Sequence, residues 1–307
     1  MGQDANTRTT YNSTLNQRDL TAYVTNVSPK DTPLYSLIGR TTGTARQKES
    51  VTDVLQAANK DNALVEGALV TTNSTTNDRS TESNWMQIFT KIIEVSGTQE
   101  AVLKFGGVTS ELAYQIEKQY KELGTDVETA LINGTGATGA TGTARKMYGL
   151  LSKITTNTAT AASANAQWTG TATGDYTNFE NTLLDLLQAM YETGQTADTI
   201  ICSGTAKRRI SKLSTKLTMM MDATAKKSVM VISSYESDFG EVSVILDRYV
   251  PKGTIIALKI DMFKVAYLRP FSQEPLAKTA DSKQVAIIGE LTLAFDTEKA
   301  GGTLVFG

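Results

Sequence analysis

The chain has 307 residues, of which 40% are hydrophobic and 20% charged, and its formal net charge is −2. Its length suits one large domain or two ordinary ones, and its composition is that of a folded protein. The absence of histidine excludes Ser-His-Asp and Cys-His catalysis and histidine-ligated zinc, and the single cysteine, Cys202, excludes an intrachain disulfide. The sequence contains no dense cluster of lysine and arginine, so it gives no indication of sequence-specific binding to nucleic acid.

No apolar run approaches the roughly 18 residues needed to span a bilayer. Residues 1–14 are polar and lack the apolar segment of a signal peptide. We therefore expect a protein with no membrane partner.

Residues 1–43 are predicted to form an N-terminal arm. Single apolar residues are scattered through the polar residues 1–30, as in an extended segment that packs against another surface. The sequence DTPL at 31–34 is a helix-start pattern, because proline is favoured in the first helical turn. The short helix is expected to end at Gly39 or Gly43.

Residues 44–98 are predicted to form one long hairpin. Its first strand, 46–55, carries charges on both faces, and its second strand, 85–95, carries apolar side chains on both faces. A hairpin with one doubly polar strand is poorly stable alone, so we expect it to lie on a neighbouring subunit. The candidate contact residues are four charged and two aromatic side chains: Arg46, Lys48, Glu49, Asp53, Trp85 and Trp168.

A single long helix is predicted over residues 108–132. Its apolar residues recur at three- and four-residue steps, at Leu112, Ile116, Tyr120, Leu123, Val127 and Leu131. At 1.5 Å per residue such a helix is roughly 37 Å long. It is expected to end at Asn133 and Gly134.

The rest of the chain mixes predicted helices and strands. The glycine- and threonine-rich residues 134–142 and 155–175 are expected to be loops, the first of them flexible. A helix is expected to start with a capping box of Thr177 and Glu180 and to end at Gly194. Further elements are expected at 199–202 (a strand with a buried Cys202), 205–213 (a helix), and 228–233, 241–247, 254–260, 263–268 and 284–295 (strands). This mixture without a βαβ rhythm predicts an α+β fold.

Three patterns resemble chemical sites but have simpler explanations. GTGATG at 134–139 matches the dinucleotide fingerprint, but the strand that should precede it is replaced by a helix. DFG at 238–240 matches a kinase motif, but a kinase also needs a histidine that the chain lacks. Glu290, Asp296 and Glu298 are interpreted as solvated residues at a sheet edge. We therefore predict no enzyme activity, no catalytic or metal site and no cofactor, and an enzyme that uses the glycine loop stays as a rival hypothesis.

Several C-terminal segments resemble one known family. These are SDFG at 237–240, RYVP at 248–251, YLRPF at 267–271, LAKT at 276–279 and GELTL at 289–293. They are similar to a subgroup of tailed-bacteriophage major capsid proteins with the Hong Kong 97-type fold. DTPL at 31–34, VSGTQ at 95–99 and GLL at 149–151 fit the same pattern.

The resemblance implies a division of the chain into five parts. These are an N-arm (1–43), an extended E-loop (44–98), a peripheral domain (99–155) with the spine helix 108–132, an axial domain (156–262) and C-terminal strands that complete the peripheral domain (263–307). It also implies self-assembly through pentamers and hexamers into an icosahedral shell. That shell would enclose double-stranded DNA without sequence-specific binding.

Further partners follow from the same resemblance. They are a portal protein and, because the chain lacks a long charged N-terminal segment, a separate scaffolding protein, unless the shell assembles without one. The location would be the virion capsid, and the host cytoplasm during assembly. No covalent cross-link between subunits is predicted. The alternatives are another phage structural protein, of the tail tube or decoration class, and an encapsulin-like compartment shell.

Overall fold

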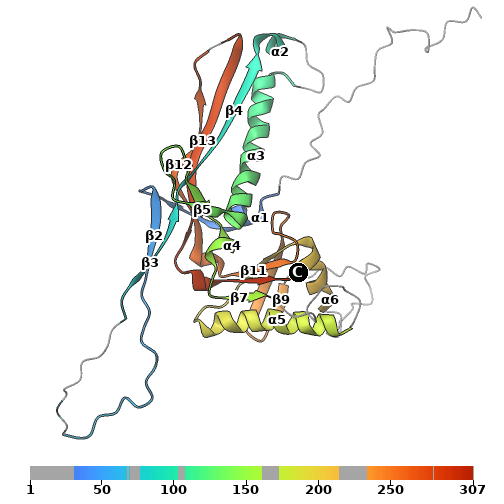
Figure 1. Cartoon of the computed structure of the whole chain (residues 1–307). Helices are drawn as coiled ribbons and strands as arrows, with labels where there is room; N and C mark the ends of the chain where they lie inside the picture. The colour runs from blue at the N-terminus through green and yellow to red at the C-terminus, as the bar shows by residue number, and fades with distance from the viewer. Residues whose placement is uncertain are drawn as a thin grey trace, which may run out of the picture.

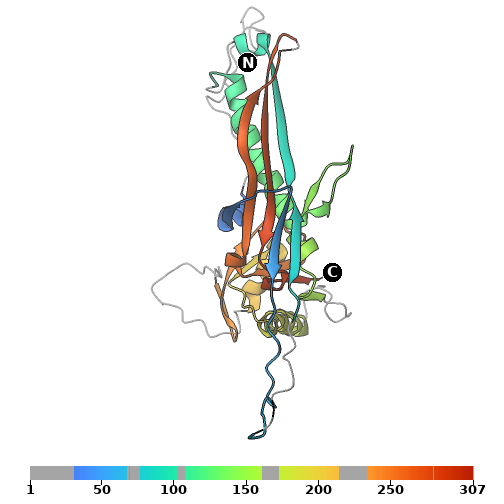
Figure 2. The same ribbon diagram turned by 90° about the vertical axis from the view of Figure 1, so that its left-hand side faces the viewer.

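The computed structural model describes residues 31–67, 69, 77–102, 108–160, 173–213, 234–278 and 280–306. In these ranges the protein has an elongated part built on one sheet, a more compact part built on a second sheet, and an arm that projects from between them (Figures 1 and 2). The architecture is the mixed α+β one that the sequence predicts.

The elongated part contains a four-stranded sheet in the order β1 (Gly39–Thr42), β12 (Phe263–Pro275), β13 (Ser282–Phe295), β4 (Gln87–Ser96). β12, β13 and β4 are antiparallel neighbours, and β1 lies parallel to β12. The long helix α3 (Glu111–Asn133) runs along one face of this sheet (Figure 1). Alternation along β4 turns Phe89, Ile93 and Val95 into the core and leaves Ile88 and Ile92 exposed on the other face.

The compact part contains a six-stranded sheet. Its order is β7 (Thr158–Thr160), β14 (Gly301–Val305), β11 (Thr254–Leu258), β8 (Thr199–Cys202), β10 (Gly240–Leu246), β9 (Ser234–Ser237). The helices α5 (Thr173–Glu192) and α6 (Gly204–Leu213) belong to this part, and α5 lies along its outer side (Figure 1).

The central strands of the second sheet join two hydrophobic cores. In β11, Ile256 and Leu258 belong to the core that contains α3, whereas Ile255 and Ala257 belong to the core that contains α5. A strand buried on both faces is an unbroken apolar run, which explains why all five residues of β11 are buried.

Within the described residues, short helices connect these elements. They are α1 (Pro33–Leu37), α2 (Gly97–Ala101), α4 (Leu150–Lys153) and the 3₁₀ turns η3 (Ile260–Met262) and η4 (Glu298–Ala300). α1 ends at Leu37, ahead of both predicted glycines, and Gly39 instead opens β1.

The arm differs from the predicted hairpin in its second strand. β2 (Gln47–Thr52) pairs with β3 (Ser80–Trp85), and not with residues 85–95. Those residues form β4, which pairs with β13 in the body. The apolar side chains of β4 bury against α3, and this tertiary burial outweighs a local pairing with a polar strand.

Several other predictions need correction. α3 begins at Glu111 with Ser110 as its N-cap, three residues later than predicted, and α5 begins at Thr173, so Thr177 lies inside the helix and not at its start. Residues 134–142 are not a flexible loop, since they enter a hairpin of β5 (Thr135–Ala137) and β6 (Lys146–Tyr148). The predicted strand at 228–233 lies outside the described residues.

The C-terminal strands divide between the two sheets. β12 continues past Pro270 to Pro275, because register shifts between Tyr267 and Ser272 let the strand accommodate a residue without an amide hydrogen. β14, which the pattern did not predict, pairs with β11 in the second sheet. Residues 301–305 of the predicted C-terminal strands therefore lie in the second sheet.

Candidate assembly surface

The root of the arm brings together two of the predicted contact residues. The guanidinium carbon of Arg46 lies 5.7 Å from the centre of the Trp85 ring. Trp85 faces Gln47 across the β2–β3 ladder, so Arg46 reaches it from the adjacent position. A guanidinium within about 6 Å of an indole ring is attracted to it, and this contact stiffens the point where the arm leaves the body.

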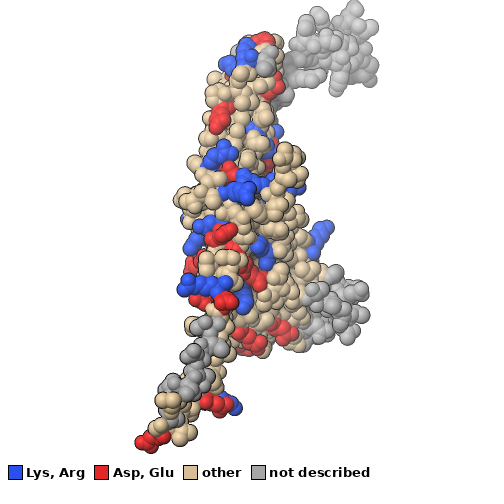
Figure 3. Space-filling model, turned by 60° about the vertical axis from the view of Figure 1, so that its left-hand side comes forward, with Lys and Arg blue, Asp and Glu red and all other residues tan. Residues whose placement is uncertain are grey.

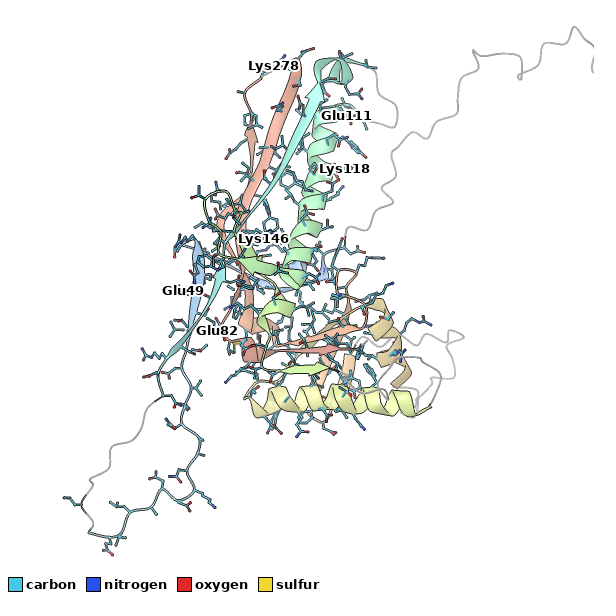
Figure 4. The ribbon with its side chains drawn as sticks, viewed as in Figure 1. Glu49, Glu82, Glu111, Lys118, Lys146 and Lys278 are labelled. Carbon is cyan, nitrogen blue, oxygen red and sulfur yellow. The ribbon has the colours of Figure 1, made fainter. Side chains whose placement is uncertain are left out.

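The other charged candidates lie farther along the arm. Lys48 and Glu49 are opposite Asn84 and Ser83 in the ladder, and neither forms a salt bridge within the described residues. Asp53 pairs with Arg79 at 3.3 Å, across the arm. Glu49 and Glu82 both lie at the arm's root in Figure 4. Trp168 lies outside the described residues.

Asn84 anchors the arm, and the sequence pattern did not single it out. Its side-chain amide donates to the carbonyl oxygens of Tyr148 and Leu293, both at 2.9 Å, and its Oδ1 accepts from the Tyr148 amide at 2.8 Å. It is buried. Its two partner residues lie 64 and 209 residues away in the sequence, so no local pattern points to Asn84.

Beyond this anchor the arm exposes large apolar side chains. Five of them protrude from the projecting segment: Val54, Leu55, Leu64, Val65 and Leu69. Leu55 is 93% exposed and Leu69 is 83% exposed. The segment reaches well away from the body in Figures 1 and 2. Clusters of exposed apolar residues mark interaction sites.

Charges of both signs are interspersed over the body (Figure 3). The face that Figure 3 shows carries neither a broad basic nor a broad acidic area. Mixed charges of this kind favour contacts that depend on local complementarity rather than on the attraction of one whole charged face.

Glu290 was predicted to be solvated, and this is wrong. Its side chain is 5% exposed and lies between Arg145, at 2.8 Å, and Arg269, at 3.2 Å. Arg145 comes from the segment leading into β6 and Arg269 from β12, so Glu290 ties the β5–β6 hairpin to the sheet. Only the fold brings these three residues together. Asp296, by contrast, is largely exposed and lies 4.0 Å from Lys264.

Glu298 is partly enclosed rather than fully solvated. Its carboxylate accepts hydrogen bonds from the backbone amides and hydroxyls of Thr155 and Thr156. These bonds outweigh the opposing effect of burial and hold the pKa of Glu298 below its usual value.

The patterns that resemble chemical sites have structural roles. GTGATG follows α3 and enters β5, so no helix opens at its end to hold a phosphate. DFG forms the turn from β9 to β10, where Gly240 has a φ of +125° and Phe239 contacts the Tyr191 ring. Burial raises the pKa of the Cys202 thiol to about 11, as for an inert thiol.

The ranges given above contain neither a cluster of metal ligands nor a membrane-spanning helix. Within them, no three histidine, cysteine, aspartate or glutamate side chains are grouped to hold a metal ion. No helix there combines the length and apolar character needed to cross a bilayer.

The fold matches those of solved capsid shells. The capsid of cyanophage A-1(L) superposes with a TM-score of 0.69 at 15% identity, over 97% of this chain and 99% of that chain. An encapsulin complex from Synechococcus elongatus PCC 7942 superposes with a TM-score of 0.58 at 13% identity, over 95% of this chain and 92% of that chain. These similarities define the class as the Hong Kong 97-like capsid fold.

The chain belongs to the SU10 major capsid protein family, whose model matches residues 4–305. It is also 32% identical over 116 residues to the major capsid protein of Escherichia phage Phieco32. That match covers 38% of the chain and 32% of the relative's length. The resemblance to tailed-phage major capsid proteins is thereby confirmed, and the family is one of structural shell proteins of the virion rather than of enzymes.

Proposed function

We propose that this chain is the repeating subunit of a phage capsid shell and that its arm supplies the main contact between neighbouring subunits. The observation that carries this proposal is the arm itself. It is locked at its root by Asn84 and the Arg46–Trp85 contact, yet it presents Leu55, Leu69 and their apolar neighbours to solvent. Such an arm gains its stability when it lies on another copy, since burial of apolar surface then becomes available.

The parts of the chain take the roles that the capsid fold suggests. The arm from β2 to β3 would be the extended loop, and α3 with the long sheet would form the peripheral domain around its spine helix. The six-stranded sheet with α5 and α6 would form the axial domain, which meets its symmetry mates around the centre of each pentamer or hexamer. Residues 1–43 would be the N-arm.

Closed symmetry explains why modest contacts suffice. Each subunit repeats the same contact around a ring, and rings repeat it over the shell. Once one contact has formed, the next forms at high effective concentration. The proposal includes assembly in the host cytoplasm, a portal protein, a separate scaffolding protein, and enclosure of double-stranded DNA without sequence-specific binding.

The proposal is tested first by the assembly state. We expect the purified chain to give closed shells in negative-stain electron microscopy, or pentamers and hexamers near five or six times 33.1 kDa by light scattering. A strict monomer or dimer at all salt concentrations and with crowding agents would contradict it. Stacked rings or tubes would favour a tail protein instead.

A second test addresses the charged residues at the arm's root. Lys48 and Glu49 lack ion-pair partners among the described residues, so we propose that their partners lie on the neighbouring subunit. The double charge reversal K48E/E49K should then abolish or slow assembly. The matched control is E117K/K121E, which reverses an exposed pair on α3 whose charged atoms lie 2.5 Å apart. Unchanged assembly of K48E/E49K would refute the role of these charges.

An encapsulin-like compartment is the second candidate, since an encapsulin has the same fold. The family match favours the phage capsid. The contents of purified particles distinguish the two, because a compartment would hold protein cargo and a mature phage shell would hold DNA.

A further inference from the structure

β4 is an edge strand of the long sheet. It lies at one end of the strand order, and within the described residues no strand pairs with its outer side. Its ladder with β13 covers all ten of its residues without a register shift. Proteins usually protect so long an edge with a proline, a bulge or an outward lysine, because its outer amides and carbonyls can pair with a further strand. β4 has no proline and no bulge.

The face of β4 that points away from α3 exposes apolar side chains. Ile92 is 65% exposed and Ile88 is 49% exposed. In the ladder with β13, Ile92 lies opposite Ala286 and Thr90 lies opposite Ile288. The apolar surface therefore continues from the edge strand onto its neighbour.

The charged side chains of β4 already have partners within the chain. The Lys91 amine turns toward α3 and pairs with Glu122 at 3.7 Å and with Asp126 at 2.9 Å. The Glu94 carboxylate accepts a hydrogen bond from the Ser282 hydroxyl at 2.6 Å. Backbone and apolar surface thus remain open along this edge, and an uncharged extended segment fits such a surface by adding a strand.

A segment of this character precedes α1. The sequence at 20–27 is LTAYVTNV, which carries no charge and lies between Asp19 and Lys30. Most of its residues are of the β-branched and aromatic types that are enriched in strands: Thr21, Tyr23, Val24, Thr25 and Val27. In an extended conformation the run is roughly 26 Å long and has apolar side chains on both faces.

Contacts around α1 fix the place where this segment leaves the body. The backbone amides of Leu34 and Tyr35 donate to the two carboxylate oxygens of Glu128 on α3, at 2.8 and 2.7 Å. Asp31, ahead of α1, pairs with Arg248 at 3.6 Å. The chain therefore enters α1 at a defined point beside α3.

This entry point and β4 lie on opposite flanks of α3, at the same height along the helix. Thr32 lies beside Gly124, whereas Lys91 of β4 pairs with Glu122 and Asp126. Positions 122 and 126 point about 160° away from position 124 around a helix. In Figure 2 the blue helix α1 and the cyan strand β4 accordingly lie on opposite sides of the long sheet.

The geometry favours β4 of a second copy over β4 of the same chain. Residues 28–31 span at most about 14 Å when fully extended. Half the circumference of a helix that is about 11 Å in diameter is longer, roughly 17 Å. A second copy that is related head to tail instead brings its β4 edge alongside the segment, and contacts of this heterologous kind close into rings.

We propose that residues 20–27 of one subunit add as a strand to the outer edge of β4 in the next subunit. The proposal rests on the proposed shell function, which supplies the second copy. Apolar side chains of the added strand lie beside Ile88 and Ile92, and its backbone pairs with the open edge. Each subunit then donates one strand and receives one, so the contact repeats around the ring.

Disulfide trapping in assembled particles tests this contact. The native Cys202 is buried, so introduced cysteines report on the surface. One protein carries Ile92→Cys and a second carries a single cysteine at one of the positions 22–27, and the two are mixed before assembly and then oxidised. Non-reducing gels should show a mixed dimer. Its yield should be several-fold higher at alternate positions than at those between them, because side chains of a strand alternate between two faces.

A pair of proline variants tests the backbone pairing. Tyr23→Pro and Val24→Pro remove adjacent amides, of which only one points toward β4 in an added strand. Each is combined with the best-trapping cysteine at another position. One variant should lose most of the mixed dimer and the other should keep it. Equal yields in the two variants would overturn strand addition.

The controls distinguish other occupants of the edge. Gln188→Cys, exposed on α5, replaces Ile92→Cys as the matched control and should trap no mixed dimer. A disulfide that forms only within a doubly substituted chain would assign the segment to its own β4. Dimers of Ile92→Cys alone would indicate pairing between two β4 edges, and trapping by Leu55→Cys in place of the N-terminal cysteines would assign the edge to the arm. Each of these results would overturn the proposal.

Light scattering of the same samples separates this contact from the shell function. Particles that assemble without the mixed dimer would refute the strand addition and leave the shell function in place. A wild-type chain that never assembles would refute the shell function, and the strand addition with it.

Discussion

The body and the arm contain the same kinds of residue, but these residues are buried and paired in the body and exposed in the arm. In the body, Leu131 and Leu293 are fully buried, and even the carboxylate of Glu290 has two cationic partners. In the arm, Leu55 and Leu69 are nearly free of contact and the paired strands cover only a short ladder. The body therefore contains the contacts that fold it, whereas the arm lacks them. The comparison predicts that stability and assembly depend on separate sets of residues.

The largest loss of stability is expected from a cavity at the base of α3. Leu131→Ala removes a side chain that is 0% exposed and lies in the core shared by both sheets. We expect a loss of about 2–5 kcal/mol in the free energy of unfolding, measured by urea denaturation of the unassembled chain. Leu55→Ala is the control from the arm and should change stability by less than about 0.5 kcal/mol. Equal losses in the two variants would remove the distinction between body and arm.

The next largest effect is expected from the buried carboxylate. Glu290→Ala leaves Arg145 and Arg269 without their partner, but their side chains are 26% and 53% exposed and can turn to water. The loss should therefore lie near 2–3 kcal/mol, below the value for a fully buried pair. Thermal unfolding measures it. A change below about 0.5 kcal/mol would show that Glu290 is not a structural anchor.

A smaller effect is expected at the start of α3. The Ser110 hydroxyl oxygen accepts from the Ala113 amide and donates to Glu100 on α2. Ser110→Ala should cost about 1 kcal/mol, with increased hydrogen exchange in the first turn of α3. Ser96→Ala removes the comparable cap of the five-residue α2 and serves as comparison. A larger loss at Ser96 than at Ser110 would contradict the expectation that the cap of the longer helix contributes more to stability.

The smallest effect on stability, with the largest effect on assembly, is expected in the arm. The double variant L55S/L69S should change the free energy of unfolding by less than about 0.5 kcal/mol, because both side chains already meet solvent. Shell formation, followed by light scattering, should fail. Ala57→Ser, at another exposed position of the arm, should still assemble. Normal shells from L55S/L69S would exclude the arm's apolar residues from the contact.

Local sequence patterns predicted several helices and strands of this protein. The three- and four-residue spacing from Leu112 to Leu131 predicts α3, because one apolar stripe suffices to define an amphipathic helix. The buried run at 199–202 and the alternation over 284–295 likewise correspond to β8 and β13. Because the sequence has no histidine, it excludes the classes of enzyme whose catalysis requires one.

Only the tertiary structure decided which strands pair and which polar residues are buried. Residues 85–95 were predicted to be the second strand of the arm's hairpin, yet nearly all of them belong to β4, which pairs with β13 and packs its apolar face against α3. Glu290, Glu128 and Asn84 look like ordinary polar residues in the sequence. The partners of Asn84 lie 64 and 209 residues away along the chain, and those of Glu128 lie 93 and 94 residues away. Burial of a polar group depends on such distant partners, and a single sequence records no distances between residues that meet only after folding.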